Sequence, residues 1–415
     1  MLGALPAVAV GAPSPSATQP AVAPHVTHLR LSQLVGDGMV MQREARIPVW
    51  GWAAPADRVV VTFDDRDYAA TPDAAGRWSV TLPPMPAGGP HAMTVAAGGG
   101  RVAVRDILVG DVWVCSGQSN MEFVVRDARD GAADVAAAHD PRIRHFKVPT
   151  SWAWAWAPSD SLAGGAWEPA DPQHVGQFTA VGYFFARDLR KSVDVPIGLL
   201  HTSWGGSRIE PWTSREALGP GDAALARLQA DERAYEARTR DSLRARIGGE
   251  LPTRDAGMVD AVDGQHVNKI PQAVILDLGE ADNIHPRDKQ DVGARLALAA
   301  RRVAYGQAVE ASGPAYRRSR VDGGRIVVEF DHAGGLQARA RGGVPAGTVG
   351  GFAVAGDDRR FAWADARIEG ERVVVSSAAV PHPVAVRYAW ADNPDRANLY
   401  NAAGLPAVPF GTDAW

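Results

Sequence analysis

The stretch "DVWVCSGQSNMEF", residues 111–123, changes abruptly from apolar residues to a cluster of small polar ones. Residues 112–115 have the composition of a buried strand, and the polar residues 116–120 follow directly. In parallel sheets, ligands bind beyond the carboxyl ends of the strands. The stretch therefore predicts a buried strand that delivers polar side chains to a site at one edge of a sheet.

Two later stretches repeat this form. Residues 195–207, "VPIGLLHTSWGGS", and residues 273–286, "AVILDLGEADNIHP", each join a predicted strand to a polar loop. The spacing of apolar residues predicts helices over residues 178–193 and 287–306, and a charged helix is expected within residues 222–247. Strands that alternate with helices favour an α/β domain, here residues 107–306, with a parallel sheet covered on both faces.

The rest of the 415 residues is too long to share one core with this domain. Residues 28–106 and 307–415 carry short alternating segments separated by Gly and Pro, which predicts two β-sandwich-like domains. Residues 1–27 are apolar and then rich in Ala, Pro and Ser, as in a signal-peptide remnant followed by a linker. We expect a secreted or periplasmic protein, with a cytoplasmic one as the alternative because the stretch lacks a positive n-region.

Composition narrows the choice of partners. The 43 basic and 47 acidic residues are well mixed and give a net charge of -4, so no basic stripe predicts nucleic-acid binding. No run approaches the roughly 20 apolar residues of a membrane helix. A neutral or weakly charged substrate fits best, and the sequence leaves the oligomeric state open.

The polar loops contain the residues of a nucleophilic site. Asp282 and His285 are three apart, a spacing that lets one loop hold a carboxylate against an imidazole. Ser119 is the natural nucleophile for that base, and Gly205-Gly206 allows backbone N–H groups to approach an oxyanion. By pattern alone, a D-x-x-H segment after a strand is more often an ordinary loop with a helix cap.

The sequence also offers a cysteine nucleophile and a metal site as alternatives. Cys115, the single cysteine, lies within the apolar run, where a cysteine is usually a small buried hydrophobe, so Ser119 is preferred as nucleophile. His285 and Asp288 could ligate a metal, but no second histidine cluster supports a metal site. We therefore expect no metal and no organic cofactor.

Five segments, taken together, resemble the sialate O-acetylesterases, carbohydrate esterases of the SGNH-hydrolase superfamily. They are "GDVWVCSGQSNMEF", "FTAVGYFFARDL", "IGLLHTSWGGSRIEPWTS", "DLGEADNIHPRDKQDVGARLA" and "VRYAWADNPDRANLYNAAGLPAVPFGTD", in the family's chain order. The resemblance implies a flavodoxin-like SGNH-hydrolase domain flanked by β-sandwich regions.

The same resemblance implies roles for individual residues. Ser119 matches the nucleophile and contributes to the oxyanion hole, while Asp282 and His285 match the acid and base. Gly205 or Gly206 matches the glycine donor of the oxyanion hole. Weaker expectations concern substrate contacts, for which the candidates are Gln118, Asn120 and Arg208.

One departure from the family matters. The family carries a further strand between the second and last motifs, ending in a Q-G-E-S-N-like segment that supplies a side-chain donor to the oxyanion hole. This third block is missing here, so the esterase domain is predicted to be shortened. Gln265, His266 and Asn268 are the polar stand-ins. Loss of one oxyanion donor typically costs about a hundredfold to a thousandfold in rate.

These observations predict a carbohydrate O-acetylesterase that acts on an acetylated sugar, most specifically a sialate O-acetylesterase. Two alternatives stay open. One is a deacetylase of a polysaccharide such as acetylated xylan, which the same site would serve. The other is a degenerate, non-catalytic member of the family that at most binds glycans.

Overall fold

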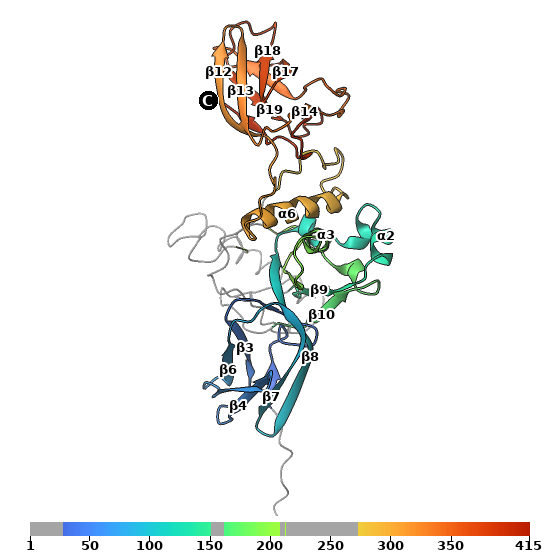
Figure 1. Cartoon of the computed structure of the whole chain (residues 1–415), viewed down its shortest axis with the longest axis vertical. Helices are drawn as coiled ribbons and strands as arrows, with labels where there is room; N and C mark the ends of the chain where they lie inside the picture. Colours follow the sequence, from blue (N-terminus) through green and yellow to red (C-terminus); the bar gives the residue numbers. More distant parts are fainter. Residues whose placement is uncertain (1–27, 151–161, 208–211, 213–272) are drawn as a thin grey trace, which may run out of the picture.

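The structure, a computed structural model, describes residues 28–150, 162–207, 212 and 273–415. Figure 1 shows these residues in three regions along the long axis of the molecule. The N-terminal strands lie at one end, the helices α3 (Ala180–Arg190) and α6 (Lys289–Val303) lie in the middle, and the C-terminal strands lie at the other end. The chain therefore combines mixed sheets with few helices.

One long strand, β8 (Gly100–Cys115), runs through two of these regions. Its first part pairs antiparallel with β7 (Gly88–Ala97), and its last residues pair parallel with β11 (Ile197–His201). The predicted boundary between residues 106 and 107 falls within this strand, next to Asp106, whose φ is 55°. An eight-stranded sheet thus joins the N-terminal β region to the strands that carry the polar loops.

The eight-stranded sheet has a simple order. From one edge to the other it runs β10 (Trp167–Ala170), β9 (Asp140–Lys147), β11, β8, β7, β4 (Val59–Phe63) and β5 (Arg66–Ala70), and β2 (Val40–Gln42) pairs with β8. A second, three-stranded sheet has the order β1 (Arg30–Leu31), β3 (Ile47–Trp52), β6 (Arg77–Leu82). Buried residues from both sheets form one hydrophobic cluster, as expected for two packed β layers.

The parallel part of the sheet aligns three strand ends. His201 at the end of β11 is the register partner of both Cys115 at the end of β8 and Lys147 at the end of β9. Parallel strands point their carboxyl ends to one edge, so the loops that follow β8 and β11 leave the sheet side by side. The predicted strands at residues 112–115 and 195–201 are confirmed as the ends of β8 and β11, although Val114 is exposed rather than buried. The strand β9 was not predicted.

The predicted helices over residues 178–193 and 287–306 are confirmed as α3 and α6. Each begins at a side chain that caps it: Thr179 accepts a hydrogen bond from Gly182 N–H, and Asp288 accepts one from Asp291 N–H. The two helices approach closely at Gly293, where a Cβ would lie only 2.6 Å from the backbone nitrogen of Phe185. The lack of a side chain at Gly293 allows this close approach. The shorter helices are α1 (Ser119–Glu122), η1 (Val125–Asp127), α2 (Gly131–Ala136) and η2 (Val175–Gln177). None of the helices among the described residues has the length and apolarity to cross a membrane.

The described helices cover one face of the parallel strands. Buried residues of α3 and α6 share a hydrophobic cluster with Cys115, Ile143, Ile197 and Leu199. The opposite face carries Phe146, which belongs to the cluster of the N-terminal strands instead. The charged helix expected within residues 222–247 lies outside the described residues.

The C-terminal region consists of antiparallel sheets. One has the order β12 (Ala315–Asp322), β13 (Arg325–Asp331), β18 (Arg372–Ser376), β17 (Asp365–Glu369). Another has the order β16 (Phe361–Trp363), β15 (Phe352–Ala355), β19 (Ala385–Tyr388), β21 (Phe410–Gly411), and β14 (Gln337–Ala338) pairs with β20 (Leu399–Tyr400). Buried residues of the sheets form one cluster.

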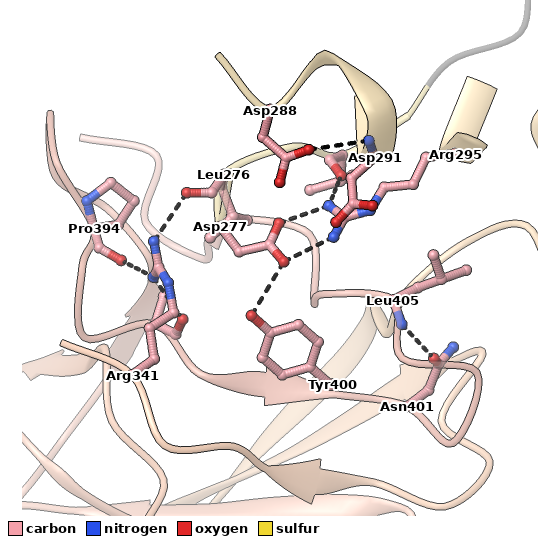
Figure 2. A network of polar contacts seen from close by, with 12 residues as sticks. Leu276, Asp277, Asp288, Asp291, Arg295, Arg341, Pro394, Tyr400, Asn401 and Leu405 are labelled. Atoms are coloured by element: carbon pink, nitrogen blue, oxygen red, sulfur yellow. Dashed lines mark hydrogen bonds and ion pairs between the residues drawn. The ribbon is translucent and has the colours of Figure 1, made fainter. Parts of the chain in front are cut away.

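The third strand predicted for residues 273–279 is wrong, because this segment forms turns and irregular backbone. Its polar and apolar groups face the C-terminal region and α6 instead. Leu276 packs against the C-terminal hydrophobic cluster, and its carbonyl accepts a hydrogen bond from Arg341 at 3.1 Å. Figure 2 shows Asp277 between Arg295 of α6 and Tyr400 of β20, with which it forms hydrogen bonds of 2.6 and 2.8 Å to Arg295 and 3.2 Å to Tyr400.

We expect Arg295→Met to destabilise the protein by about 3 to 5 kcal/mol, because it leaves the Asp277 carboxylate buried without its cation. Burial alone would raise the pKa of Asp277, but the hydrogen bonds and charge of Arg295 outweigh burial and lower it. The contribution of the pair is therefore present above the unfolded pKa of about 3.9 and is lost as the pH falls through the lower folded value.

Urea unfolding of wild type and variant at pH 7 and at progressively lower pH measures this effect. The matched control is Arg317→Met, because Arg317 and Asp331 form an exposed pair at 3.8 Å and its removal should leave stability unchanged. Equal stability of Arg295→Met and wild type at pH 7 would contradict the expectation.

Candidate active site

Ser119 lies where the sequence predicts it, just beyond the end of β8. It is the first residue of α1 and is partly exposed. Gly117 turns the chain between strand and helix with a φ of 140°, which favours glycine. Cys115, in contrast, is still within the strand and is 5% exposed. Burial raises the pKa of its thiol to about 12, so the thiol is not an activated nucleophile.

The double glycine after β11 packs against Ser119. A Cβ on Gly205 would lie 3.6 Å from the Cβ of Ser119 and 2.7 Å from a carboxylate oxygen of Glu122, so a side chain does not fit there. Gly206 has a φ of 74°, which favours glycine for a different reason. The structure thus brings together the serine and the double glycine that the sequence assigns to the oxyanion hole.

His285 is held by its own loop. The Asn283 side chain accepts a hydrogen bond from the His285 backbone N–H at 2.9 Å and donates one to the His285 carbonyl at 3.0 Å. Glu280 closes the loop by accepting hydrogen bonds from Asn283 Nδ2 at 3.2 Å and Arg287 N–H at 2.7 Å. The loop is therefore ordered around the histidine by an asparagine that the sequence reasoning missed.

The imidazole itself makes no polar contact with the predicted acid. Asp282 is exposed, and no hydrogen bond or ion pair joins it to His285 among the described residues. The Nε2 atom of His285 is buried without a hydrogen-bond partner in the same part of the chain. A buried ring nitrogen without a partner can form a hydrogen bond with a group that enters the site.

Asn120 connects the two loops. Its Nδ2 donates to the carbonyl of Ile284 at 3.0 Å, next to His285, and its Oδ1 accepts from Lys289 Nζ at 2.6 Å. Because Asn120 follows Ser119 directly, its side chain brings the loop of the predicted base to the loop of the predicted nucleophile. Lys289 is 2% exposed, so the amide oxygen of Asn120 also solvates a buried ammonium group.

A polar cluster that the sequence did not reveal lies under this edge of the sheet. Lys147 Nζ lies 3.3 Å from His201 Nε2, and His201 Nδ1 lies 3.1 Å from His145 Nε2. His201 Nε2 also forms a short contact with Ser203 Oγ. Since an ammonium group only donates, Lys147 makes Nε2 of His201 an acceptor and leaves the ring proton on Nδ1.

Both histidines of this cluster are neutral. Burial, with Lys147 and His145 nearby, lowers the pKa of His201 to about 2, and burial with Lys147 nearby lowers the pKa of His145 to about 3. The His145 ring stacks on Phe178 with a centroid distance of 4.2 Å. Burial also lowers the pKa of Lys147, against the opposing effect of Glu122. These groups therefore support the loop after β11 structurally and do not supply a base near neutral pH.

Of the remaining residues predicted for the site, the structure describes only Gln118. Gln118 is exposed at the start of α1, and its side chain caps no backbone group of that helix. Arg208, Gln265, His266 and Asn268 lie outside the described residues. Among the described residues, no group of three or more His, Cys, Asp or Glu could hold a metal ion.

Comparison with known proteins identifies relatives. A family model described as "Carbohydrate esterase, sialic acid-specific acetylesterase" matches residues 109–240. The sialate O-acetylesterase of Mus musculus is 31% identical over 208 residues, which cover 46% of this chain and 38% of that protein. The human sialate O-acetylesterase is 30% identical over 214 residues, covering 46% and 39% respectively. The chain thus spans less than half the length of these curated relatives.

A solved structure matches over nearly the whole chain. It is the crystal structure of a novel carbohydrate acetylesterase from Xanthomonas citri, which is 38% identical and superposes with a TM-score of 0.76. The match covers 94% of this chain and 100% of that one.

We expect Asn120→Ala to destabilise the protein by about 2 kcal/mol, because it leaves the buried Lys289 ammonium without an acceptor. Asn120→Asp keeps an acceptor for Lys289 but removes the donor to Ile284, so it should lose less stability. Urea unfolding separates the two variants, with Gln118→Ala as the stability control from the same loop. Equal stability of Asn120→Ala and wild type would argue against this bridge.

We expect the Cys115 thiol to resist labelling by a disulfide reagent at pH 8 in the folded protein, because its raised pKa keeps it protonated. Unfolding in urea should release one thiol per chain, in keeping with the single cysteine. Rapid labelling of the native protein would show that the thiol is accessible and ionised.

Proposed function

The chain belongs to the sialic acid-specific acetylesterase family of carbohydrate esterases, and from this premise we propose that it removes O-acetyl groups from sugars by a Ser-His-Asp mechanism. Membership supports hydrolase activity on an acetylated carbohydrate. The finer proposal is a sialate O-acetylesterase built on a flavodoxin-like SGNH-hydrolase domain, with Ser119, His285 and Asp282 as the reacting triad.

One observation carries this proposal: the Asn120 side chain bonds to the Ile284 carbonyl and so joins the Ser119 loop to the His285 loop. In the proposed reaction, Ser119 Oγ attacks the acetyl carbonyl while Nε2 of His285 takes the hydroxyl proton. The same proton then goes to the sugar oxygen as it leaves. Water, activated by His285, finally hydrolyses the acetyl-enzyme to acetate and frees Ser119.

Asp282 is proposed to orient His285 once substrate has entered. Its carboxylate is exposed and has no partner in the described part of the chain, and catalytic hydrogen bonds of this type often tighten only in the complex. Asn283 already holds the backbone of His285, so only the ring needs to be oriented. The carboxylate would also stabilise the imidazolium that forms during attack.

Two classes of acetylated sugar would fit the proposed reaction. Arg208 could pair with the carboxylate of a sialic acid, while a neutral acetylated polysaccharide such as xylan needs no such cation. An oxyanion hole that lacks the side-chain donor of the family's third block would favour the alternative, a weakly active or non-catalytic glycan binder. The packing of Gly205 on Ser119, together with the bond that joins the Ser119 loop to the His285 loop, favours the enzyme.

Turnover of a chromogenic acetyl ester by the purified chain tests the proposal. We expect Ser119→Ala and His285→Ala each to lower kcat by about a thousandfold or more, because the two residues act as a unit. Ser116→Ala, which removes an exposed hydroxyl three residues earlier, is the matched control and should keep full activity. Wild-type turnover that survives in Ser119→Ala would exclude Ser119 as the nucleophile. A wild-type chain without turnover would favour the glycan-binding alternative.

We expect Asp282→Asn to lower kcat about a hundredfold or more while thermal stability stays unchanged, since the exposed Asp282 carboxylate makes no bond to the residues that the structure describes. Full activity in Asp282→Asn would leave Asn283 as the group that orients the histidine and would remove Asp282 from the mechanism.

A further inference from the structure

Four polar residues around the loop after β11 have no part in the proposed proton transfers. Lys147 ends β9, His201 ends β11, Ser203 follows β11, and Glu122 ends α1. Lys147 Nζ donates to the Ser203 carbonyl at 3.2 Å and lies 3.7 Å from a carboxylate oxygen of Glu122. A single ammonium group therefore ties the loop after β11 to the helix that begins at Ser119.

Glu122 completes the connection from the other side. Its second carboxylate oxygen accepts a hydrogen bond from the backbone N–H of Gly205 at 2.5 Å. Ser119 and Glu122 are the first and last residues of α1, so one short helix fixes the nucleophile and the carboxylate relative to each other. The loop after β11 is thus held at two points, Ser203 by Lys147 and Gly205 by Glu122.

This arrangement decides which backbone groups remain for an oxyanion. The N–H of Gly205 is already bound to a carboxylate. Within the described residues, the N–H groups of Ser119 and Gly206 have no hydrogen-bond partner. Gly206 is exposed beside Gly205, which packs on Ser119. Unpaired N–H groups next to the nucleophile are what an oxyanion hole requires.

We propose that Glu122 and Lys147 are positioning residues that hold the 203–206 loop so that Gly206 N–H, rather than Gly205 N–H, joins Ser119 N–H in the oxyanion hole. This inference rests on the proposed function, since it names donors for the same acyl transfer. It also assigns a role to a carboxylate that would otherwise repel the developing oxyanion. Bound to Gly205 N–H and paired with Lys147, the charge of Glu122 is compensated.

If Glu122 instead blocked the oxyanion hole, its removal would change the rate in the opposite direction. If Glu122 occupied the donor that the oxyanion needs, its removal would free Gly205 N–H and raise the rate. If Glu122 positions the loop, its removal lets Gly206 move away from its place, and a small displacement of a catalytic group lowers the rate strongly. The two cases differ in direction, so one substitution separates them.

The experiment measures kcat and KM for a chromogenic acetyl ester with wild type, Glu122→Ala, Glu122→Gln and Lys147→Met. We expect Glu122→Ala to lower kcat about tenfold to a hundredfold with KM nearly unchanged, because donors to the oxyanion act in the transition state. Glu122→Gln keeps an amide oxygen for Gly205 N–H and should recover most of the rate. Lys147→Met should fall between them. The control, Lys191→Met, breaks only the exposed pair of Lys191 with Asp188 and should behave as wild type.

Inhibition by a boronic acid, which forms a tetrahedral adduct on a serine, adds a readout that altered folding alone would not produce. Its inhibition constant should rise in Glu122→Ala by the same factor by which kcat/KM falls, at equal melting temperature. Unchanged or increased kcat in Glu122→Ala, with wild type active and Ser119→Ala inactive, would overturn the inference while the proposed function stands. If Glu122→Ala does not fold, Glu122→Gln and Lys147→Met carry the test, and wild-type kcat in Lys147→Met would overturn it.

A crystal structure of the boronate adduct tests the choice of glycine directly. We expect an adduct oxygen within about 3 Å of the backbone nitrogens of Ser119 and Gly206, with the bond from Gly205 to Glu122 intact. An oxygen bound by Gly205 N–H, with Glu122 displaced, would overturn the assignment of Gly206.

Discussion

The parallel pairing of β11 with β8 is the constraint on which the candidate site depends. Residues 197–201 align with residues 111–115, so both strands end level, and the loops that follow them meet at once. Ser119 and the double glycine lie within a few residues of those ends. Because β8 continues into the antiparallel N-terminal sheet, the edge that carries the site is also anchored far from it. The N-terminal region therefore supports the position of Ser119 through one unbroken backbone.

Charged groups are buried where these loops meet the rest of the chain. Lys289, Asp277 and Arg295 each have a polar or charged partner there. Lys289 is almost completely buried and donates to Asn120, while Asp277 and Arg295 form a pair with 9% and 12% exposed side chains. A buried charge destabilises a fold unless hydrogen bonds replace its hydration. The partners here come from other loops and regions, so each compensated charge also fixes the distance between two parts of the site.

Sequence patterns predicted those elements whose burial follows from their own composition. The strands at residues 112–115 and 197–201 are apolar, and α3 has regular apolar spacing with a capping threonine. The pattern was wrong for residues 273–279, where apolar residues pack on the C-terminal core without sheet pairing. It missed β9, because Arg144, His145 and Lys147 look like a solvated segment. These residues are accommodated by contacts invisible in sequence, among them the ion pair of Arg144 with Asp106 at 2.8 Å.

In the candidate site, too, the sequence could indicate some residues and not others. Chain order and motif were enough to place Ser119 and the double glycine directly after β8 and β11, whereas His285 was proposed from its motif alone, since the strand predicted before it does not form. The contacts of Glu122 and Lys147 could not be predicted, because they depend on which loop lies opposite. Asn120 illustrates the difference: its position beside Ser119 suggested a substrate contact, whereas its amide bonds to Ile284 and Lys289 in the structure.

The loop of His285 is held from two sides, and this makes the C-terminal region part of the site. On one side, Asn120 ties the loop to Ser119. On the other, Arg341 binds the Leu276 carbonyl and Tyr400 binds Asp277, as Figure 2 shows. A chain ending at residue 306 would keep all three proposed triad residues but would lose the second set of contacts. The place of the His285 loop is therefore determined jointly by the Ser119 loop and by the C-terminal region, and the chemistry proposed here needs both.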